Sequence, residues 1–217
     1  MPATQRYIVQ QLYDVDPWAG YSPTRPAGDY VQGWNGDHAS LGRLVNATAS
    51  KVVLDVGVWK GQSCITLARA MKNAGIDGCV IAIDTFLGSS EHWRSDISLF
   101  NRHNGMPDLY RTFMDNAVHA GVADYVVPMP QTSSTAAIVL GRCGIKAAIA
   151  HIDAAHEYRE VLRDVEDYWE LLAPGGFLIG DDYVDGWPGV IRAAGEFSAR
   201  QVRPLTIEPP KWILQKA

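Results

Sequence analysis

The sequence predicts an α/β fold in which a mostly parallel sheet is covered by helices on both faces, forming a three-layer sandwich. From Lys51 onward, apolar segments of strand length alternate with helical segments. These strand segments are apolar at consecutive positions, which is typical of strands buried on both faces. Hydrophobic residues make up 47% of the 217 residues, which is enough for one substantial core.

The predicted elements follow one another in a regular order. Residues 14–37 are rich in Gly, Pro, Asp and aromatic residues, and we expect an irregular arm there, followed by a short helix at 38–47. The clearest helix has apolar residues at steps of three and four from Tyr158 to Leu172. Predicted strands are 51–56, 78–84, 125–129, 147–153 and 177–181, with helices at 61–73, at 109–120 and from Pro188, and short β segments at 205–207 and 212–214.

The chain is expected to form one domain. Residues 1–50 lack a periodic core of their own, so we interpret them as an N-terminal arm and helix belonging to the main domain of residues 51–217. The long connection 85–124 is interpreted as an insertion or lid, because insertions at this end of a sheet often form substrate walls. The arm, with Tyr30 and Trp34, could close over the site from the other side; surface packing is the alternative for both segments.

Composition excludes several classes of function. The formal charge of −5 argues against a general nucleic-acid binder, which would present a basic face. The three cysteines are scattered and show no C-x-x-C spacing, which favours a reducing cytoplasm over a disulfide framework or a zinc site. Neither a signal peptide nor an apolar segment of membrane-spanning length is visible, so no membrane partner is expected. A homo-oligomer remains open.

Acidic residues end several of the predicted strands. Asp55, Asp84 and Asp153 end the first, second and fourth strands, and Asp181 with Asp182 ends the fifth. The carboxyl ends of parallel strands meet at one edge of a sheet, where ligands bind. The sequence therefore predicts a ligand site lined by carboxylates, with 131–134 after the third strand as a further contributor.

The first strand is followed by a glycine-containing turn that ends in a helix. In the segment from Asp55 to Gly61, glycines at 57 and 61 would let a ligand approach backbone N–H groups at a helix N-terminus. An ordinary tight turn is the alternative. Asp84 sharpens the interpretation, because an acidic residue there can accept hydrogen bonds from both hydroxyls of a ribose. Together these features favour a nucleoside-containing ligand.

Trp59 separates two kinds of nucleoside ligand. The dinucleotide fingerprint needs glycine at this position, where the backbone touches a pyrophosphate. S-adenosylmethionine has no pyrophosphate. The tryptophan therefore disfavours a nicotinamide-dependent oxidoreductase and favours the methyl donor.

Two segments carry a resemblance to a known family. Val53-Leu-Asp-Val-Gly-Val-Trp-Lys-Gly-Gln-Ser63 and Ile83-Asp-Thr-Phe-Leu-Gly-Ser89 resemble the class I S-adenosylmethionine-dependent methyltransferases. More narrowly, the chain is similar to the branch with macrolide-sugar O-methyltransferases and cephalosporin hydroxylase-like proteins. The resemblance covers about Gly33 to Trp212 and implies a seven-stranded, Rossmann-like sheet. It implies donor-binding roles for Asp55, Gly57, Trp59, Gly61, Asp84, Thr85, Phe86, Gln131, Ser133 and Asp153.

The later aspartates predict a reactive centre. Clustered carboxylates are costly unless a cation neutralises them, and oxygen ligands suit Mg²⁺. A metal would lower the pKa of a hydroxyl and orient it towards the methyl group. His156 lies three residues after Asp153 and titrates near neutral pH, so it is a candidate base. Structural alternatives are a helix cap at Asp153, a turn cap at the Asp181–Asp182 pair and a packed histidine.

Similarity to catechol and macrolide-sugar O-methyltransferases implies specific roles for these residues. Asp153, Asp181 and Asp182 would be metal ligands, and His156 and Asp153 the catalytic residues. The expected function is metal-assisted O-methylation of a small-molecule hydroxyl acceptor such as a sugar or natural product. A metal-independent methyltransferase and a non-catalytic, donor-binding accessory protein are the alternatives.

Overall fold

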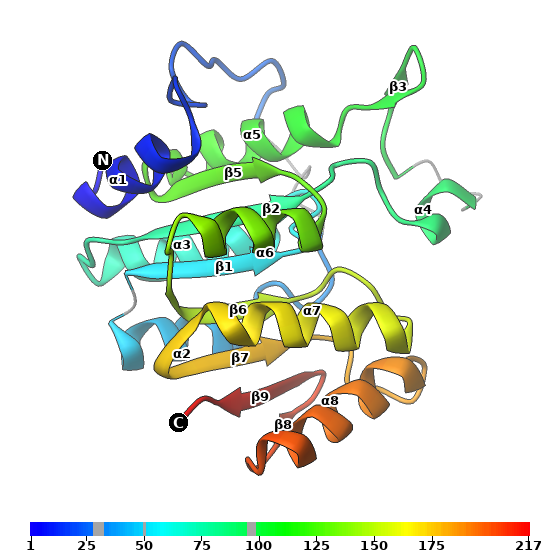
Figure 1. Cartoon of the computed structure of the whole chain (residues 1–217). Helices are drawn as coiled ribbons and strands as arrows, with labels where there is room; N and C mark the ends of the chain where they lie inside the picture. Colours follow the sequence, from blue (N-terminus) through cyan, green and yellow to red (C-terminus); the bar gives the residue numbers. More distant parts are fainter. Residues whose placement is uncertain (28–32, 50, 95–98) are drawn as a thin grey trace.

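A computed structural model of the chain describes residues 1–27, 33–49, 51–94 and 99–217, so Tyr30 of the expected arm lies outside the described residues. A seven-stranded sheet runs through the centre in the order β5-β2-β1-β6-β7-β9-β8 (Figure 1). The first five strands in this order are parallel, whereas β9 is antiparallel to both β7 and β8. The strands are β1 (Val52–Val56), β2 (Cys79–Asp84), β5 (Val126–Pro130), β6 (Ala147–Ile152), β7 (Leu172–Gly180), β8 (Thr206–Glu208) and β9 (Lys211–Gln215).

Helices cover both faces of this sheet, which confirms the predicted three-layer α/β fold (Figure 1). Successive residues of β1 explain why both faces are apolar: Leu54 packs into one core and Val53 into the other, and both are fully buried. One face carries α1 (Ala3–Leu12), α6 (Ser133–Arg142), α7 (Tyr158–Leu171) and α8 (Pro188–Gln201), and the other carries α2 (Ala39–Thr48), α3 (Gln62–Asn73) and α5 (Leu109–His119).

The predicted apolar stripe of α7 is confirmed, with Val161, Val165 and Tyr168 buried in the core. The predicted end of this helix is too late. Leu172 belongs to β7, where it pairs with Ala147 of β6, so sheet pairing overrides the helical periodicity at this residue. The sequence prediction also omitted α1 and α6.

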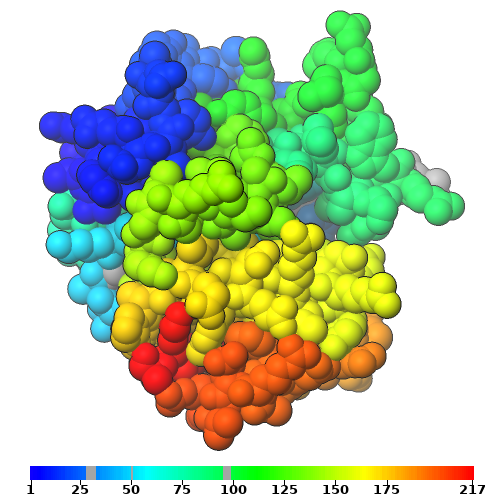
Figure 2. Space-filling model, in the orientation of Figure 1, coloured from blue at the N-terminus to red at the C-terminus, as the bar shows by residue number. Residues whose placement is uncertain are grey.

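Residues 85–124 form an excursion at the carboxyl edge of the sheet. Besides α5, its described part contains α4 (Ser90–Arg94), the hairpin strands β3 (Arg102–His103) and β4 (Met106–Pro107), and a 3₁₀ turn at Ala123–Tyr125. Figure 2 shows a recess between this excursion, in teal and green, and α7, in yellow. None of the described helices combines the length and apolar character of a membrane span.

Candidate active site

A cavity of about 790 Å³ opens at the carboxyl ends of β1, β2, β5 and β6. Its wall includes Gly57 after β1, Asp84 at the end of β2, Gln131 after β5 and Asp153 after β6. The parallel strands therefore bring to one place the polar residues that the sequence predicts there. The excursion supplies Glu91 to the same wall.

The turn after β1 needs glycine at one position. Gly57 has a φ of 88°, and a Cβ placed on it would lie 2.0 Å from the carbonyl oxygen of Asp153. The β1 turn and the β6 turn thus touch through their backbones. Asp153 N–H also donates to the Val56 carbonyl at 2.8 Å, which fixes the two strand ends against each other.

Asp84 organises the backbone around the cavity. Its Oδ2 accepts a hydrogen bond from the Trp59 N–H at 2.9 Å, and its Oδ1 accepts one from the Phe86 N–H at 2.7 Å. Both donor residues have left-handed backbone conformations, so the carboxylate stabilises two strained turns. Burial raises the pKa of Asp84, although these hydrogen bonds oppose the shift. A carboxylate has about four acceptor sites, so Asp84 keeps acceptor capacity for a ligand hydroxyl.

Most of the predicted donor residues reach the cavity, and three lie behind its wall. Asp55 is fully buried, Phe86 packs against Phe113 and Tyr110, and Gly61 also faces Phe113. These three residues lie behind the residues that line the cavity and support them. The predicted residues that line the cavity are Gly57, Trp59, Asp84, Thr85, Gln131, Ser133 and Asp153.

A buried chain of polar side chains runs beneath the cavity and across four strands. Asp55 Oδ2 accepts from the Ser63 hydroxyl at 2.8 Å, and its Oδ1 lies 2.7 Å from His151 Nδ1. Lys211 Nζ lies 3.0 Å from His151 Nε2 and 2.6 Å from Asp181 Oδ2. An ammonium group can only donate, so His151 Nε2 accepts and its Nδ1 carries the proton that reaches Asp55.

Asp153 stands out among the acidic residues of the site. It lines the cavity, and no hydrogen bond to its carboxylate occurs within the described part of the chain. Desolvation raises the pKa of Asp153 well above the ordinary value, and the negative charges of Asp181 and Asp182 add to the rise, while Lys211 opposes it. This carboxylate therefore lacks a counter-charge of its own.

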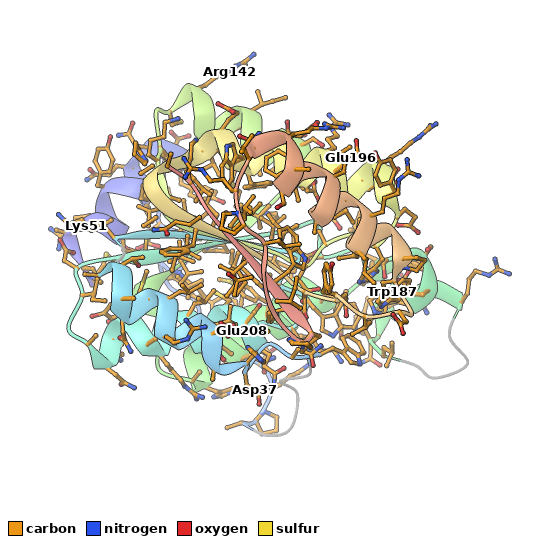
Figure 3. All side chains as sticks on the ribbon, turned by 90° about the horizontal axis from the view of Figure 1, so that it is seen from below. Asp37, Lys51, Arg142, Trp187, Glu196 and Glu208 are labelled. Carbon is orange, nitrogen blue, oxygen red and sulfur yellow. The ribbon has the colours of Figure 1, made fainter. Side chains whose placement is uncertain are left out.

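His156 is held by neighbours on three sides. Its Nε2 lies 2.8 Å from Asp182 Oδ2, its Nδ1 lies 3.5 Å from Glu91 Oε1, and its ring stacks on Trp187 at 4.1 Å. Figure 3 shows Trp187 at the beginning of α8. Burial lowers the pKa of His156, but the hydrogen bond and charge of Asp182, helped by Glu91, raise it above 6.5. The protonated form of His156 is therefore more stable than that of an ordinary histidine.

The three aspartates predicted as metal ligands are divided between two clusters. Potential ligand atoms of Asp153, His156 and Asp182 lie within 4.8 Å of one another, and so do those of His151, Asp153 and Asp181. Asp181 is nearly buried and is paired with Lys211. The chain turns sharply at Asp182, whose φ is 60°, so the two adjacent aspartates point to different partners.

Aromatic side chains form a further part of the cavity wall. The His92 ring stacks on Trp59 at 4.1 Å and on Trp34 at 5.7 Å, which joins the arm, the β1 turn and α4. Sequence reasoning missed His92, which has no partner motif nearby in the sequence. It also missed Trp187, Glu91 and Lys211, although a lysine beginning an apolar strand is an unusual signal.

A comparison of the sequence with protein-family models agrees with this geometry. Residues 54–183 match a protein-family model described as a methyltransferase domain. The chain belongs to this methyltransferase family. The match and the strand order confirm the class I methyltransferase fold expected from the sequence. No curated protein sequence matches the chain.

Solved structures of O-methyltransferases are similar to this methyltransferase in fold. NovP aligns with a TM-score of 0.64 at 20% identity, covering 88% of this chain and 84% of NovP. The O-methyltransferase from Bacillus cereus in complex with SAH has a TM-score of 0.60 at 19% identity, with 99% and 96% coverage. TomG from Streptomyces achromogenes, in complex with SAM, has a TM-score of 0.60 at 16% identity, with 100% and 97% coverage.

The buried pair of Lys211 and Asp181 yields a prediction on stability. Lys211→Met leaves Asp181 buried without its cation and should lower the free energy of unfolding by about 3–5 kcal/mol. The double variant Lys211→Met/Asp181→Asn removes both charges and should recover much of this loss. Urea unfolding measures both, with the exposed Lys51→Met as the control. A loss below about 1 kcal/mol in the single variant would contradict a structural role for the pair.

The surroundings of His156 yield a second prediction. In NMR titrations its pKa should lie above 6.5 and should fall in Asp182→Asn, because burial then outweighs the remaining acidic neighbours. A raised folded-state pKa stabilises the protein at pH values below the unfolded pKa. This stabilisation is lost as the pH rises through the folded-state pKa. An unchanged His156 pKa in the variant would show that Asp182 does not control it.

Proposed function

We propose that this methyltransferase transfers a methyl group from S-adenosylmethionine to a hydroxyl of a small acceptor, such as a sugar or natural product, with assistance from a divalent cation, Mg²⁺. The proposal depends on the environment of the Asp153 carboxylate. Its carboxylate faces the cavity without a hydrogen-bond partner in the described residues, and Asp182 and His156 lie beside it. A carboxylate in this state is suited to a cation or to a substrate hydroxyl.

The donor assignment is supported at the opposite end of the cavity. The remaining acceptor capacity of Asp84 suits a ribose hydroxyl, and Thr85, Gln131 and Ser133 on the same wall suit an adenine. Two of the similar O-methyltransferases were solved with SAH or SAM bound. We therefore assign the adenosine to the Asp84 end and the reacting sulfonium to the Asp153 end.

The charges around Asp153 fit a divalent cation. The buried chain and Asp153 contain three carboxylates, Asp55, Asp153 and Asp181, but only one ammonium, that of Lys211. His151 is neutral in this arrangement, so two negative charges are in excess. Asp153 and Asp182 would hold the cation, since Lys211 occupies Asp181. When bound, such a cation lowers the pKa of an acceptor hydroxyl and orients it.

The chain's own residues account for the proton in the transfer. The acceptor oxygen forms a bond to the methyl carbon, the carbon–sulfur bond breaks, and sulfur keeps the electron pair. The hydroxyl proton needs a base. Where no cation is bound, Asp153 suits this step, because its raised pKa favours uptake of a proton. With a cation held by Asp153 and Asp182, His156 beside them is the candidate base.

A metal-independent methyltransferase is the second candidate. Lys211 pairs with Asp181, and His156, whose pKa is raised, pairs with Asp182. These pairs favour a site that works without a cation. In that case Asp153 alone would orient the acceptor and take its proton.

The three cysteines are free, which agrees with the reducing cytoplasm that we propose as the location.

Two conservative variants separate donor binding from turnover. Asp84→Asn removes the charge that faces the ribose and should weaken binding of S-adenosylhomocysteine about tenfold, as measured by calorimetry. Asp153→Asn should leave that affinity nearly unchanged but reduce turnover by about two orders of magnitude, because the carboxylate that holds the cation or takes the proton is lost. The exposed Asp185→Asn is the control. Equal losses of donor affinity in both variants would argue against separate roles.

A chelation experiment tests the role of the cation. Acceptors with free hydroxyls are screened by formation of S-adenosylhomocysteine, and the active pairs are treated with a chelator. We expect turnover to fall more than tenfold and to return with Mg²⁺, because several kcal/mol of charge stabilisation are removed. Mn²⁺ binding, measured by calorimetry, should weaken in Asp153→Asn and Asp182→Asn. Full activity after chelation would support the metal-independent candidate.

A further inference from the structure

A second, much smaller cavity adjoins the main one. Its volume of about 10 Å³ is close to the space that a single water molecule needs. Asp153, His156 and Asp182 line both cavities, whereas Asp181 and Trp212 line only the small one. Asp153 therefore borders two spaces, the cavity proposed for the donor and acceptor and this small one.

The Trp212 indole is the unusual group in the wall of the small cavity. Its Nε1 is buried and has no hydrogen-bond partner among the described residues. Gly180 makes room for this ring, since a Cβ placed on Gly180 would lie 2.4 Å from Trp212 Nε1. Gly180 pairs with Trp212 across β7 and β9 and directly precedes Asp181. An unpaired buried N–H is costly, so this indole requires an acceptor next to the acidic turn.

The spacing of two carboxylates in this wall suits a bridging water. Carboxylate oxygens of Asp153 and Asp181 lie within 4.8 Å of each other. A water that donates a hydrogen bond of about 2.8 Å to each of two oxygens holds them about 4.5 Å apart. Together with the bond accepted from Trp212, the water would make three hydrogen bonds, the usual number for a buried water.

A cation fits this small space less well than a water. The Trp212 N–H only donates hydrogen bonds, and a donor cannot coordinate a cation. Lys211 Nζ already places a positive charge 2.6 Å from Asp181 Oδ2, and it lies 3.0 Å from His151 Nε2, whose lone pair it occupies. Mg²⁺ also keeps several waters of its own, for which about 10 Å³ is too little. A water both accepts and donates, as these neighbours require.

We propose that one buried water occupies the small cavity, accepts from the Trp212 indole N–H and donates to the carboxylates of Asp153 and Asp181. The water connects Asp153 to the buried chain through Asp181. Trp212 thereby acts as a positioning residue, which orients the Asp153 carboxylate so that its remaining acceptor sites serve the main cavity. The effect of this orientation on a cation or an acceptor rests on the proposed function, whereas the water itself does not.

High-resolution crystallography and NMR on the full chain test the water directly. Crystals should show an ordered water at hydrogen-bond distance from Trp212 Nε1 and from the carboxylates of Asp153 and Asp181. In solution, the Trp212 indole proton should show a nuclear Overhauser effect to that water. Trp212→Phe removes the N–H and should abolish the ordered water. A dry cavity, or a Mn²⁺ ion between Asp153 and Asp181 in crystals grown with Mn²⁺, would overturn the proposal.

Calorimetry with Mn²⁺ separates the positioning role from a fold defect. Trp212→Phe should bind Mn²⁺ about tenfold more weakly, as expected when a group that orients a metal ligand is lost. Its affinity for S-adenosylhomocysteine should be unchanged. Trp169→Phe, the same change at a buried indole that packs on Phe197, is the matched control and should alter neither affinity.

Unchanged Mn²⁺ affinity in Trp212→Phe, or an equal loss in both variants, would overturn the positioning role. Failure of the unmodified protein to bind Mn²⁺ would instead overturn the proposed cation. The positioning role is then measured by turnover with the acceptors found in the screen, which Trp212→Phe should lower about tenfold and Trp169→Phe should not. Equal turnover in the two variants would in that case overturn it.

Discussion

The buried chain from Asp55 through His151 and Lys211 to Asp181 is the interaction on which the site depends. It joins β1, β6, β9 and β7 at the depth where the strands end. Charged groups there are tolerated only because each has a partner at hydrogen-bond distance. The turns that carry Gly57, Asp153 and Asp182 begin directly above this chain, so the positions of the cavity residues follow from it.

Asp153 and His156 divide the chemistry in a way that their spacing in the sequence does not reveal. His156 contacts two carboxylates and a tryptophan ring, and these contacts hold it beside Asp182. Asp153 has no comparable partner within the described chain and keeps its acceptor capacity for a ligand. Local geometry, more than residue type, therefore decides which group accepts a proton.

The parallel sheet and its acidic edge could be predicted because they follow from local patterns. Continuous apolar segments identify β1, β2 and β6, and the residue after each is read directly from the chain. Asp181 shows the limit of this reasoning: its identity and place were predicted, but its pairing with Lys211 requires the antiparallel strand β9 to lie beside β7. His92 and Glu91 reach the site only through the path of the excursion, which has no periodic pattern. Contacts between side chains far apart in the sequence depend on the tertiary structure, and local secondary-structure propensities do not predict them.

The order of the buried chain along the polypeptide has a consequence for biosynthesis. Asp55, His151 and Asp181 all precede Lys211 in the sequence, so they leave the ribosome before it. A nascent chain that ends before Lys211 carries the carboxylates of the future interior without the ammonium that balances them. Burying Asp181 at this stage would be costly, because its carboxylate would have no counter-charge. We therefore expect this edge of the sheet to close only after β9 has been synthesised and has docked on β7.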